Sequence, residues 1–138
     1  MTSLNNIILP VESEFSEFKS HYNSLFYSNV SSVDLLLKFL LQRKGKMMRP
    51  LLVLLTSKCF ATVPESVHHL AAAVELLHQG SLIHDDVVDE SDKRRGKESA
   101  NAVFDNKMAV LLGDYVVSMA LKEVTATKPV ASFSSLTS

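Results

Sequence analysis

The sequence has no tryptophan, only one cysteine, and only four glycines and four prolines in 138 residues. The lone Cys59 excludes an internal disulfide framework and fits a reducing compartment. So little glycine and proline excludes a low-complexity chain. No apolar run reaches the roughly 18 residues of a membrane-spanning helix, and the N-terminus lacks the basic and apolar regions of a signal peptide. We therefore expect a cytoplasmic protein with no transmembrane segment.

An excess of positive charge is also missing. Fourteen Lys and Arg balance fifteen Asp and Glu, so the formal net charge is −1. Binding to nucleic acid normally requires a clear cationic excess, and we expect no nucleic-acid partner. Hydrophobic residues make up 46% of the chain, which is enough to bury a core, and the length suits one domain.

Apolar residues recur at helical spacing along the chain, and the strand signal is weak, so the sequence predicts an all-α fold. The first predicted helix places five apolar residues on one side: Phe15, Phe18, Tyr22, Leu25 and Phe26. The second starts at a Ser31–Ser32 cap, and Pro50 lies near the start of the third. The predicted helices cover residues 11–27, 31–41, 47–60, 64–89, 99–104 and 107–124, with a charged loop at 90–97 and a frayed tail at 125–138.

Two glycines, Gly80 and Gly113, lie inside predicted helices. Glycine costs roughly 1 kcal/mol relative to alanine at such positions. Either another element packs closely there, or the site needs space.

Charge is distributed unevenly along the fourth predicted helix and beyond. Residues 50–84 contain only Lys58, Glu65 and Glu75 as formal charges, whereas residues 85–98 contain six acids and four bases. A solvated loop after a buried helix is one interpretation. However, Asp85 and Asp89 lie at a helix C-terminus, where each carboxylate is unfavourable by roughly 0.3–1 kcal/mol, and they repel each other on one face. A bound divalent cation would remove this conflict, and closely spaced carboxylates suit Mg²⁺.

The same helix places further polar residues near these carboxylates. At about 100° per residue, His78, Leu82, Asp85 and Asp89 lie within about 60° of one another, and Ser81 borders the stripe. His78 alone would be a core histidine. On a face shared with two carboxylates, it becomes a candidate for lining a polar cleft.

Two basic clusters flank this helix in the sequence. One surrounds Gly45 before a helix N-terminus, and the other follows the acidic cluster. Each alone fits ordinary turn charge, but a helix start with nearby Lys and Arg also suits phosphate. Both clusters together with the carboxylates point to a substrate with more than one phosphate. Their members are Arg43, Lys44, Lys46 and Arg49, and Lys93, Arg94, Arg95 and Lys97.

The sequence resembles the N-terminal half of the long-chain trans-polyprenyl diphosphate synthases through four elements in the right order and spacing. They are Gly45-Lys-Met-Met-Arg-Pro50, His78 seven residues before Asp85, Asp85-Asp-Val-Val-Asp89, and Arg94-Arg95-Gly96. The resemblance implies an incomplete, all-α isoprenoid-synthase-like fold, with residues 1–138 as the N-terminal part of a single domain. It also implies the reaction of the family, in which isopentenyl diphosphate is added to an allylic prenyl diphosphate with Mg²⁺.

The resemblance assigns roles position by position. Isopentenyl diphosphate would bind Lys46, Arg49, His78 and Arg95. Mg²⁺ bridging to the allylic diphosphate would bind Asp85 and Asp89, with Asp86 alongside. Arg94 would contact the allylic diphosphate, so that the catalytic residues are Asp85, Asp89 and Arg94. Product length would depend on Gly80 and Ser81, five and four residues before Asp85, and on the deeper Leu77 and Val74. Because none of these four is aromatic, we expect a long-chain product.

The family carries a second aspartate-rich motif downstream, and this sequence has no such motif after Asp89. We therefore expect the 138-residue chain alone to be inactive. We also expect a homodimer or higher self-association through an apolar helix containing Val110, Leu111, Val116, Val117 and Leu121. The alternatives are a non-catalytic helical partner subunit or diphosphate-binding module, and a helical domain whose charged loop binds nothing.

Overall fold

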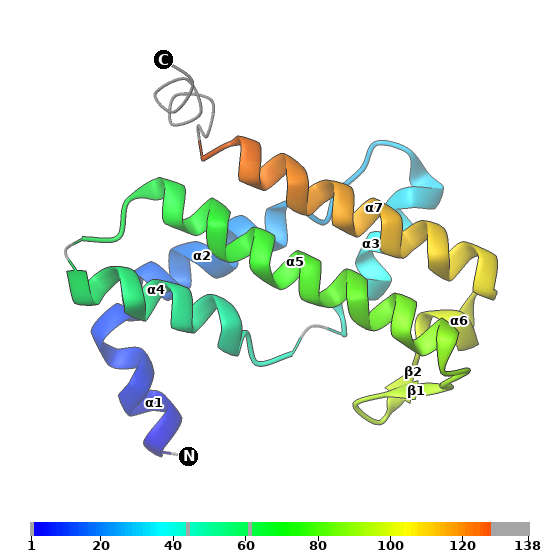
Figure 1. The fold of residues 1–138 in the computed structure, drawn as a ribbon, viewed down its shortest axis with the longest axis horizontal. Coiled ribbons are helices and arrows are strands. Elements are labelled where there is room, and N and C mark those ends of the chain that lie inside the picture. Colours follow the sequence, from blue (N-terminus) through cyan, green and yellow to red (C-terminus); the bar gives the residue numbers. More distant parts are fainter. Residues whose placement is uncertain (1, 44, 61, 128–138) are drawn as a thin grey trace.

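The computed structural model describes residues 2–43, 45–60 and 62–127. This part of the chain is helical apart from one small hairpin, which confirms the all-α class (Figure 1). The elements in chain order are α1 (Thr2–Ile8), the 3-10 helix η1 (Leu9–Val11), α2 (Glu12–Ser24), α3 (Ser31–Leu41), α4 (Met48–Phe60), α5 (Glu65–Val88), β1 (Lys93–Arg94), β2 (Lys97–Glu98), α6 (Ala100–Val103) and α7 (Asn106–Thr125).

The long helix α5 forms the centre of the molecule. It packs most extensively against α7, which runs antiparallel beside it, and next against α4 (Figure 1). Helices α2 and α6 cover further parts of α5. Because α5 is surrounded by other helices, it needs apolar residues on several sides. It supplies four of them to the core: Ala71, Ala72, Leu76 and Ile83. The C-terminal end of α5 lies beside the hairpin and α6 (Figure 1).

Close packing explains the two helical glycines. A Cβ atom on Gly80 would lie 2.9 Å from Cγ2 of Val117 and 3.3 Å from the carbonyl oxygen of Gly113. A Cβ atom on Gly113 would overlap the imidazole ring of His84. The backbones of α5 and α7 therefore approach at these positions because neither glycine has a side chain. Gly80 faces α7 in this structure, and its expected role in product length stays a prediction.

The predicted aromatic face of α2 is confirmed. Phe15, Phe18, Tyr22 and Phe26 are all buried, and neighbouring rings contact each other with centroids 5.0–6.4 Å apart. The helix itself is shorter than expected and ends at Ser24. Its aromatic face anchors the N-terminal segment to the core.

The start of α3 differs from the predicted cap. Neither Ser31 nor Ser32 caps the helix, whose N-cap position is Val30 without a side-chain hydrogen bond. Instead, Oδ1 of Asp34 accepts a hydrogen bond from the backbone N–H of Ser28 at 3.0 Å. The turn before α3 is thus fixed by an acid inside its first turn. Helix α1 was not expected at all, since its sequence has no strong apolar periodicity.

The charged segment after α5 is an ordered hairpin where a loop was expected. Strands β1 and β2 pair antiparallel, with Lys93 opposite Glu98 and Arg94 opposite Lys97. The two turn residues, Arg95 and Gly96, have φ angles of 55° and 78°. Two consecutive positive φ angles are typical of the type I′ turn, which matches the twist of the paired strands.

Helix α7 confirms the last predicted helix within two residues at each end. Its apolar face divides between core and surface. Val116 is fully buried, contrary to its expected place on an exposed face, whereas Leu111 and Leu121 are each 59% exposed. Residues 128–138 of the expected frayed tail lie outside the described residues. No helix among the residues that the structure describes is long and apolar enough to cross a bilayer.

Candidate active site

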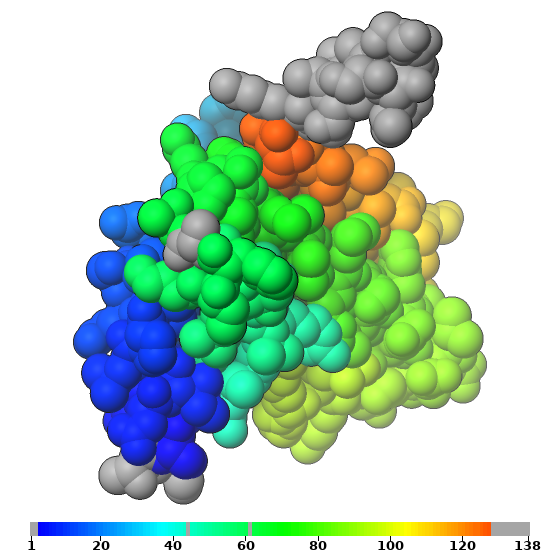
Figure 2. Space-filling model, turned by 60° about the vertical axis from the view of Figure 1, so that its left-hand side comes forward, coloured from blue at the N-terminus to red at the C-terminus, as the bar shows by residue number. Residues whose placement is uncertain are grey.

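A cavity of about 530 Å³ lies between the start of α4, the side of α5 and the hairpin. It brings together three of the predicted substrate-binding cations, Lys46, Arg49 and Arg95, which come from two segments far apart in the sequence. Figure 2 shows the teal surface of the turn before α4 beside the yellow-green surface of the hairpin. The full lining is Gly45, Lys46, Met47, Met48, Arg49, Glu75 and Arg95.

Hydrogen bonds join the turn before α4 to the hairpin. Nε of Arg43 donates to the carbonyl oxygen of Glu98 at 3.1 Å, and Nζ of Lys97 donates to that of Gln42 at 3.4 Å. The guanidinium of Arg95 lies directly over Gly45, where a Cβ atom would be only 2.8 Å from its Cζ. A side chain at position 45 would require the flexible end of Arg95 to shift, so the absence of a Cβ on Gly45 allows the guanidinium to occupy its observed place.

Backbone strain marks the same cavity. Met47 and Arg95 both line it, and both have positive φ angles, of 60° and 55°. Such conformations cost of order 1–3 kcal/mol for residues other than glycine and cluster at functional sites. An Asn or Gly would suit the turn position of Arg95 better, so the arginine is retained there at the expense of stability.

His78 lies beside these cations on α5. Its side chain is half-buried, and burial lowers its pKa below the ordinary value of 6.5, with further lowering by the nearby Arg49 and Arg95. The neutral imidazole is therefore favoured next to the cationic cavity. His78 thus lies beside the cationic cavity, on the polar stripe that the helical register predicts.

The three aspartates at the end of α5 fall into two different environments. Asp85 and Asp89 are exposed, and Asp89 is the C-cap residue, with its N–H donating to the carbonyl oxygen of Asp85 at 2.8 Å. Asp86, one position along, is only 4% exposed. A step of one residue turns a helix by about 100°, which separates Asp86 from the open face that Asp85 and Asp89 share.

The buried Asp86 pairs with Arg94 of the hairpin. Nη2 of Arg94 donates to Oδ1 of Asp86 at 2.5 Å, and Nε donates to Oδ2 at 3.3 Å. These hydrogen bonds raise the pKa of Arg94, and the negative charges of Asp85 and Asp89 contribute further. Asp86 therefore holds the hairpin in place, and this structure does not group its carboxylate with the exposed pair expected to bind Mg²⁺.

The sequence of this chain is similar to those of known proteins. A sequence model of the Polyprenyl synthetase family matches residues 31–138, which is most of the chain. The chain belongs to the polyprenyl synthetase family. Among relatives, it is 40% identical over 116 residues to an all-trans-nonaprenyl-diphosphate synthase (geranyl-diphosphate specific) of Rhodobacter capsulatus, covering 83% of this chain and 36% of that protein. It is 37% identical over 99 residues to an octaprenyl diphosphate synthase of Escherichia coli (strain K12), covering 72% of this chain and 31% of that protein.

Solved structures show the same fold in polyprenyl synthetases. A decaprenyl diphosphate synthase from Rhodobacter capsulatus matches with a TM-score of 0.80 and 31% identity over 88% of this chain and 38% of that one. A polyprenyl synthase from Caulobacter crescentus CB15, complexed with calcium and isoprenyl diphosphate, matches with a TM-score of 0.82 and 29% identity. This match covers 90% of this chain and 38% of that one. The predicted isoprenoid-synthase-like fold is confirmed. The chain spans between 31% and 38% of the length of these relatives.

In this polyprenyl synthetase chain, a continuous face of α5 leads away from Asp85. Ser81 and Leu77 are exposed on it, and Val74 is half-buried. Oγ of Ser81 donates to the carbonyl oxygen of His78 at 2.8 Å, so its hydroxyl is turned back onto the helix. These three predicted chain-length residues share one face, because spacings of three and four residues align on a helix. Gly80 lies apart from them against α7.

The cavity also contains an acid that sequence reasoning did not assign. Glu75 is only 3% exposed and accepts a hydrogen bond from Nε2 of Gln79 at 3.0 Å. Its carboxylate is the one acidic group among the residues that line the cationic cavity. The sequence did carry a signal for it, because Glu75 is one of only three charges between residues 50 and 84.

Proposed function

We propose that this chain forms the part of a long-chain trans-polyprenyl diphosphate synthase that binds isopentenyl diphosphate and shares Mg²⁺ with an allylic prenyl diphosphate. The observation that carries the proposal is the cavity that gathers Lys46, Arg49 and Arg95. In this view residues 1–138 form the N-terminal part of one helical synthase domain. The names of the relatives, which are octaprenyl, nonaprenyl and decaprenyl synthases, support a long-chain product.

The cationic cavity suits the diphosphate of isopentenyl diphosphate. Three like charges around one cavity repel each other, and the single Glu75 offsets only part of this repulsion. A diphosphate, with several negative charges, would relieve it and would accept charge-assisted hydrogen bonds from Lys46, Arg49 and Arg95. His78 would border this anion. The apolar Met47 and Met48 would contact the short hydrocarbon part of the substrate.

The exposed carboxylates suit Mg²⁺. Asp85 and Asp89 are both open to solvent on one face at the negative end of a helix, an arrangement that costs stability unless a cation is bound. Two carboxylates provide few ligands, and Mg²⁺ in proteins commonly completes its shell with water and substrate phosphate. When bound, Mg²⁺ would stabilise the negative charge that develops on the departing allylic diphosphate.

Arg94 would supply a further positive group at the allylic diphosphate, beside Mg²⁺. Asp86 engages Nε and Nη2 of its guanidinium, which fixes its orientation. The proposal assigns the diphosphate to the remaining Nη1. A pre-oriented guanidinium loses little conformational entropy on binding, so Asp86 acts as a positioning residue for Arg94.

Calorimetric titration of the 138-residue chain with isopentenyl diphosphate tests the proposal. We expect binding that Lys46→Ala and Arg95→Gly each weaken by about tenfold or more, as loss of a charge-assisted hydrogen bond predicts. Arg95→Gly is the sharper variant because glycine suits the turn, so the loss cannot be ascribed to unfolding. Lys107→Ala, at an exposed position on α7, is the control and should bind as the parent does. Unchanged binding by both cavity variants would contradict the proposal.

A partner subunit is the second candidate function. One relative, 41% identical over 85 residues, is named heptaprenyl diphosphate synthase component 2, from Geobacillus stearothermophilus. Under both candidates we expect no elongation of a radiolabelled allylic substrate by the 138-residue chain alone, because a single carboxylate set would not neutralise the leaving diphosphate. A subunit without catalytic ligands would bind neither isopentenyl diphosphate nor pyrophosphate, whereas the proposed synthase segment binds both.

A further inference from the structure

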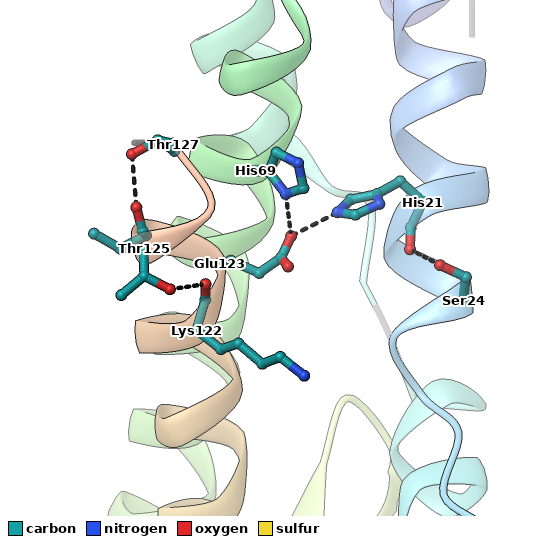
Figure 3. A network of polar contacts seen from close by, with 8 residues as sticks. His21, Ser24, His69, Lys122, Glu123, Thr125 and Thr127 are labelled. Carbon is teal, nitrogen blue, oxygen red and sulfur yellow. Dashed lines mark hydrogen bonds and ion pairs between the residues drawn. The ribbon is translucent and has the colours of Figure 1, made fainter. Parts of the chain in front are cut away.

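Two histidines and a glutamate from three different helices meet near the N-terminal end of α5. His21 comes from α2, His69 from α5 and Glu123 from α7 (Figure 3). Oε1 of Glu123 lies 2.5 Å from Nε2 of His21 and 3.0 Å from Nδ1 of His69. The three potential ligand atoms all lie within 4.8 Å of one another. These residues are as many as 102 positions apart in the sequence, so no local motif announces the cluster.

The surroundings of Glu123 favour a cation. The residue is only 6% exposed, and a buried carboxylate is costly unless it is paired or coordinates a metal. Both histidines direct a ring nitrogen at the same oxygen, Oε1, while their rings meet edge to face at 85°. Two ring nitrogens thus converge on one carboxylate oxygen, and an ion placed between these three atoms would take them as ligands in place of the two hydrogen bonds.

A third histidine supplies an independent sign of a missing partner. His68 precedes His69, and its side chain is 90% buried. Its Nδ1 has no hydrogen-bond partner among residues 2–43, 45–60 and 62–127. His68, His69 and His21 line the same cavity of about 340 Å³, together with Glu17, Val63 and Glu65. This buried nitrogen without a partner belongs to a residue that borders a polar cavity next to His69 and His21, so within the described part of the chain the polar groups beside the cluster are incompletely satisfied.

The geometry fits a small divalent cation. Zn²⁺ holds nitrogen and oxygen ligands at roughly 2.0–2.2 Å, so that tetrahedral ligand atoms are about 3.3 Å apart. The observed separations are 2.5 and 3.0 Å to Glu123 and at most 4.8 Å between any two ligand atoms. They reach this arrangement if His21 and Glu123 move apart by about 0.8 Å and the two histidine nitrogens approach each other by up to about 1.5 Å. The cavity could then supply a water as the fourth ligand. Imidazole ligands favour Zn²⁺ or a related transition metal, whereas Mg²⁺ prefers oxygen ligands only.

We propose that His21, His69 and Glu123 form a transition-metal site, for Zn²⁺, which ties α2, α5 and α7 together. The site is separate from the acidic pair, because His69 and Asp85 lie sixteen residues apart, or about 24 Å along α5. An ion bound here would stabilise the folded chain. Once the free ion concentration exceeds the dissociation constant, this stabilisation grows with the logarithm of that concentration. It would replace two hydrogen bonds to Glu123 with direct bonds from three helices to one ion.

Thermal unfolding and calorimetry of the 138-residue chain, freed of metal with a chelator, test the proposal. Excess MgCl₂ is kept present throughout, so that Mg²⁺ competes with Zn²⁺ for the exposed carboxylates at the other end of α5. We expect ZnCl₂ to bind with one equivalent per chain and to raise Tm progressively. His21→Gln should abolish the high-affinity binding and the Tm shift. Glu123→Gln should do the same and serves as the second variant if one of the two folds poorly.

The matched control is His84→Gln. His84 also contacts a carboxylate, with Nε2 at 3.2 Å from Oδ1 of Asp114, but no second histidine joins this pair among the described residues. This variant should keep the full Zn²⁺ response. A Tm shift that is the same in His21→Gln as in the parent would overturn the proposal. So would a parent chain that shows no shift and no heat of binding, which would leave the cluster as a hydrogen-bonded clamp.

Discussion

Arg94 and Asp86 form a two-point ion pair between the hairpin and the end of α5, with N–O distances of 2.5 and 3.3 Å. This pair divides the acidic cluster into one buried carboxylate with a structural task and two exposed carboxylates, Asp85 and Asp89. It also orients Arg94, while the next residue, Arg95, lines the cationic cavity. Two neighbouring residues of one tight hairpin therefore serve the two proposed substrate sites.

The stability of the chain should distinguish these aspartates. Asp86→Ala should lower the free energy of unfolding by about 1–3 kcal/mol, because it leaves the Arg94 guanidinium without its partner in a half-buried place. Asp85→Ala should raise it by about 0.5 kcal/mol, since the variant removes a carboxylate from the negative end of a helix. Urea unfolding of the two variants and the parent measures both effects. Equal destabilisation by both variants would contradict the separation of roles.

Aromatic substitutions on α5 should have opposite consequences at adjacent positions. In an active synthase that contains this sequence, Ser81→Phe should shorten the product while the protein stays folded, because Ser81 is exposed on the face that leads from Asp85. Gly80→Phe should instead destabilise the fold, by about 1–3 kcal/mol or more, because the new ring would meet Val117 and the backbone of Gly113. Product chromatography and thermal unfolding give the two readouts.

Two results would contradict this picture. A parent enzyme that stops at the farnesyl length with Ser81 in place would remove the basis for a long-chain product. A stable Gly80→Phe variant that shortens the product as Ser81→Phe does would show that both positions face the chain.

The pH dependence of stability should report on His78. Burial and Arg49 lower its pKa in the folded chain below the unfolded value of about 6.5. As the pH falls below this value, the unfolded chain takes up a proton that the folded chain resists, so the free energy of unfolding decreases. His78→Gln should reduce this loss, which urea unfolding between pH 5 and pH 7.5 measures. The buried His68, whose pKa is lowered in the same direction, should account for part of the remaining slope. If the free energy of unfolding of His78→Gln depended on pH as steeply as that of the parent, this role of His78 would be refuted.

The exposed part of the α7 apolar face should drive self-association. Leu111 and Leu121 are both 59% exposed, and burying them against a second copy would remove apolar surface from water. Sedimentation should show a dimer or larger species at micromolar concentration. Leu111→Lys with Leu121→Lys should yield a monomer, whereas Phe60→Lys, on the 86% exposed Phe60 of α4, should not. A parent chain that is monomeric at this concentration would contradict the prediction.

The sequence predicted the helices well where apolar periodicity was strong. The aromatic face of α2, the start of α5 at Glu65 and the short helix before α7 all follow from local pattern and punctuation. The two basic clusters were expected to serve one phosphate-bearing substrate, but the assignment of Lys46 and Arg95 to the same site came through resemblance to a family. Local pattern says nothing of how two turns nearly fifty residues apart meet.

What the sequence left undetermined depends on tertiary contacts. The burial of Asp86 could not be distinguished from the exposure of Asp85 by charge alone, because both are aspartates at the end of one helix. Gly80 was assigned by its distance from the motif, whereas its actual neighbour is Val117 on α7. The cluster of His21, His69 and Glu123 is invisible locally, since each residue comes from a different helix.

Asp85 and Asp89 are proposed to bind Mg²⁺ together with a diphosphate. Calorimetry of the 138-residue chain with MgCl₂, in the absence and presence of pyrophosphate, tests this proposal most directly. Two carboxylates alone offer too few oxygens for tight binding, so we expect weak binding without pyrophosphate and at least about tenfold tighter binding with it. Asp85→Ala should remove the difference, and Asp114→Ala, on α7, should retain it. Equal Mg²⁺ affinity under both conditions, or a difference that survives in Asp85→Ala, would contradict the account.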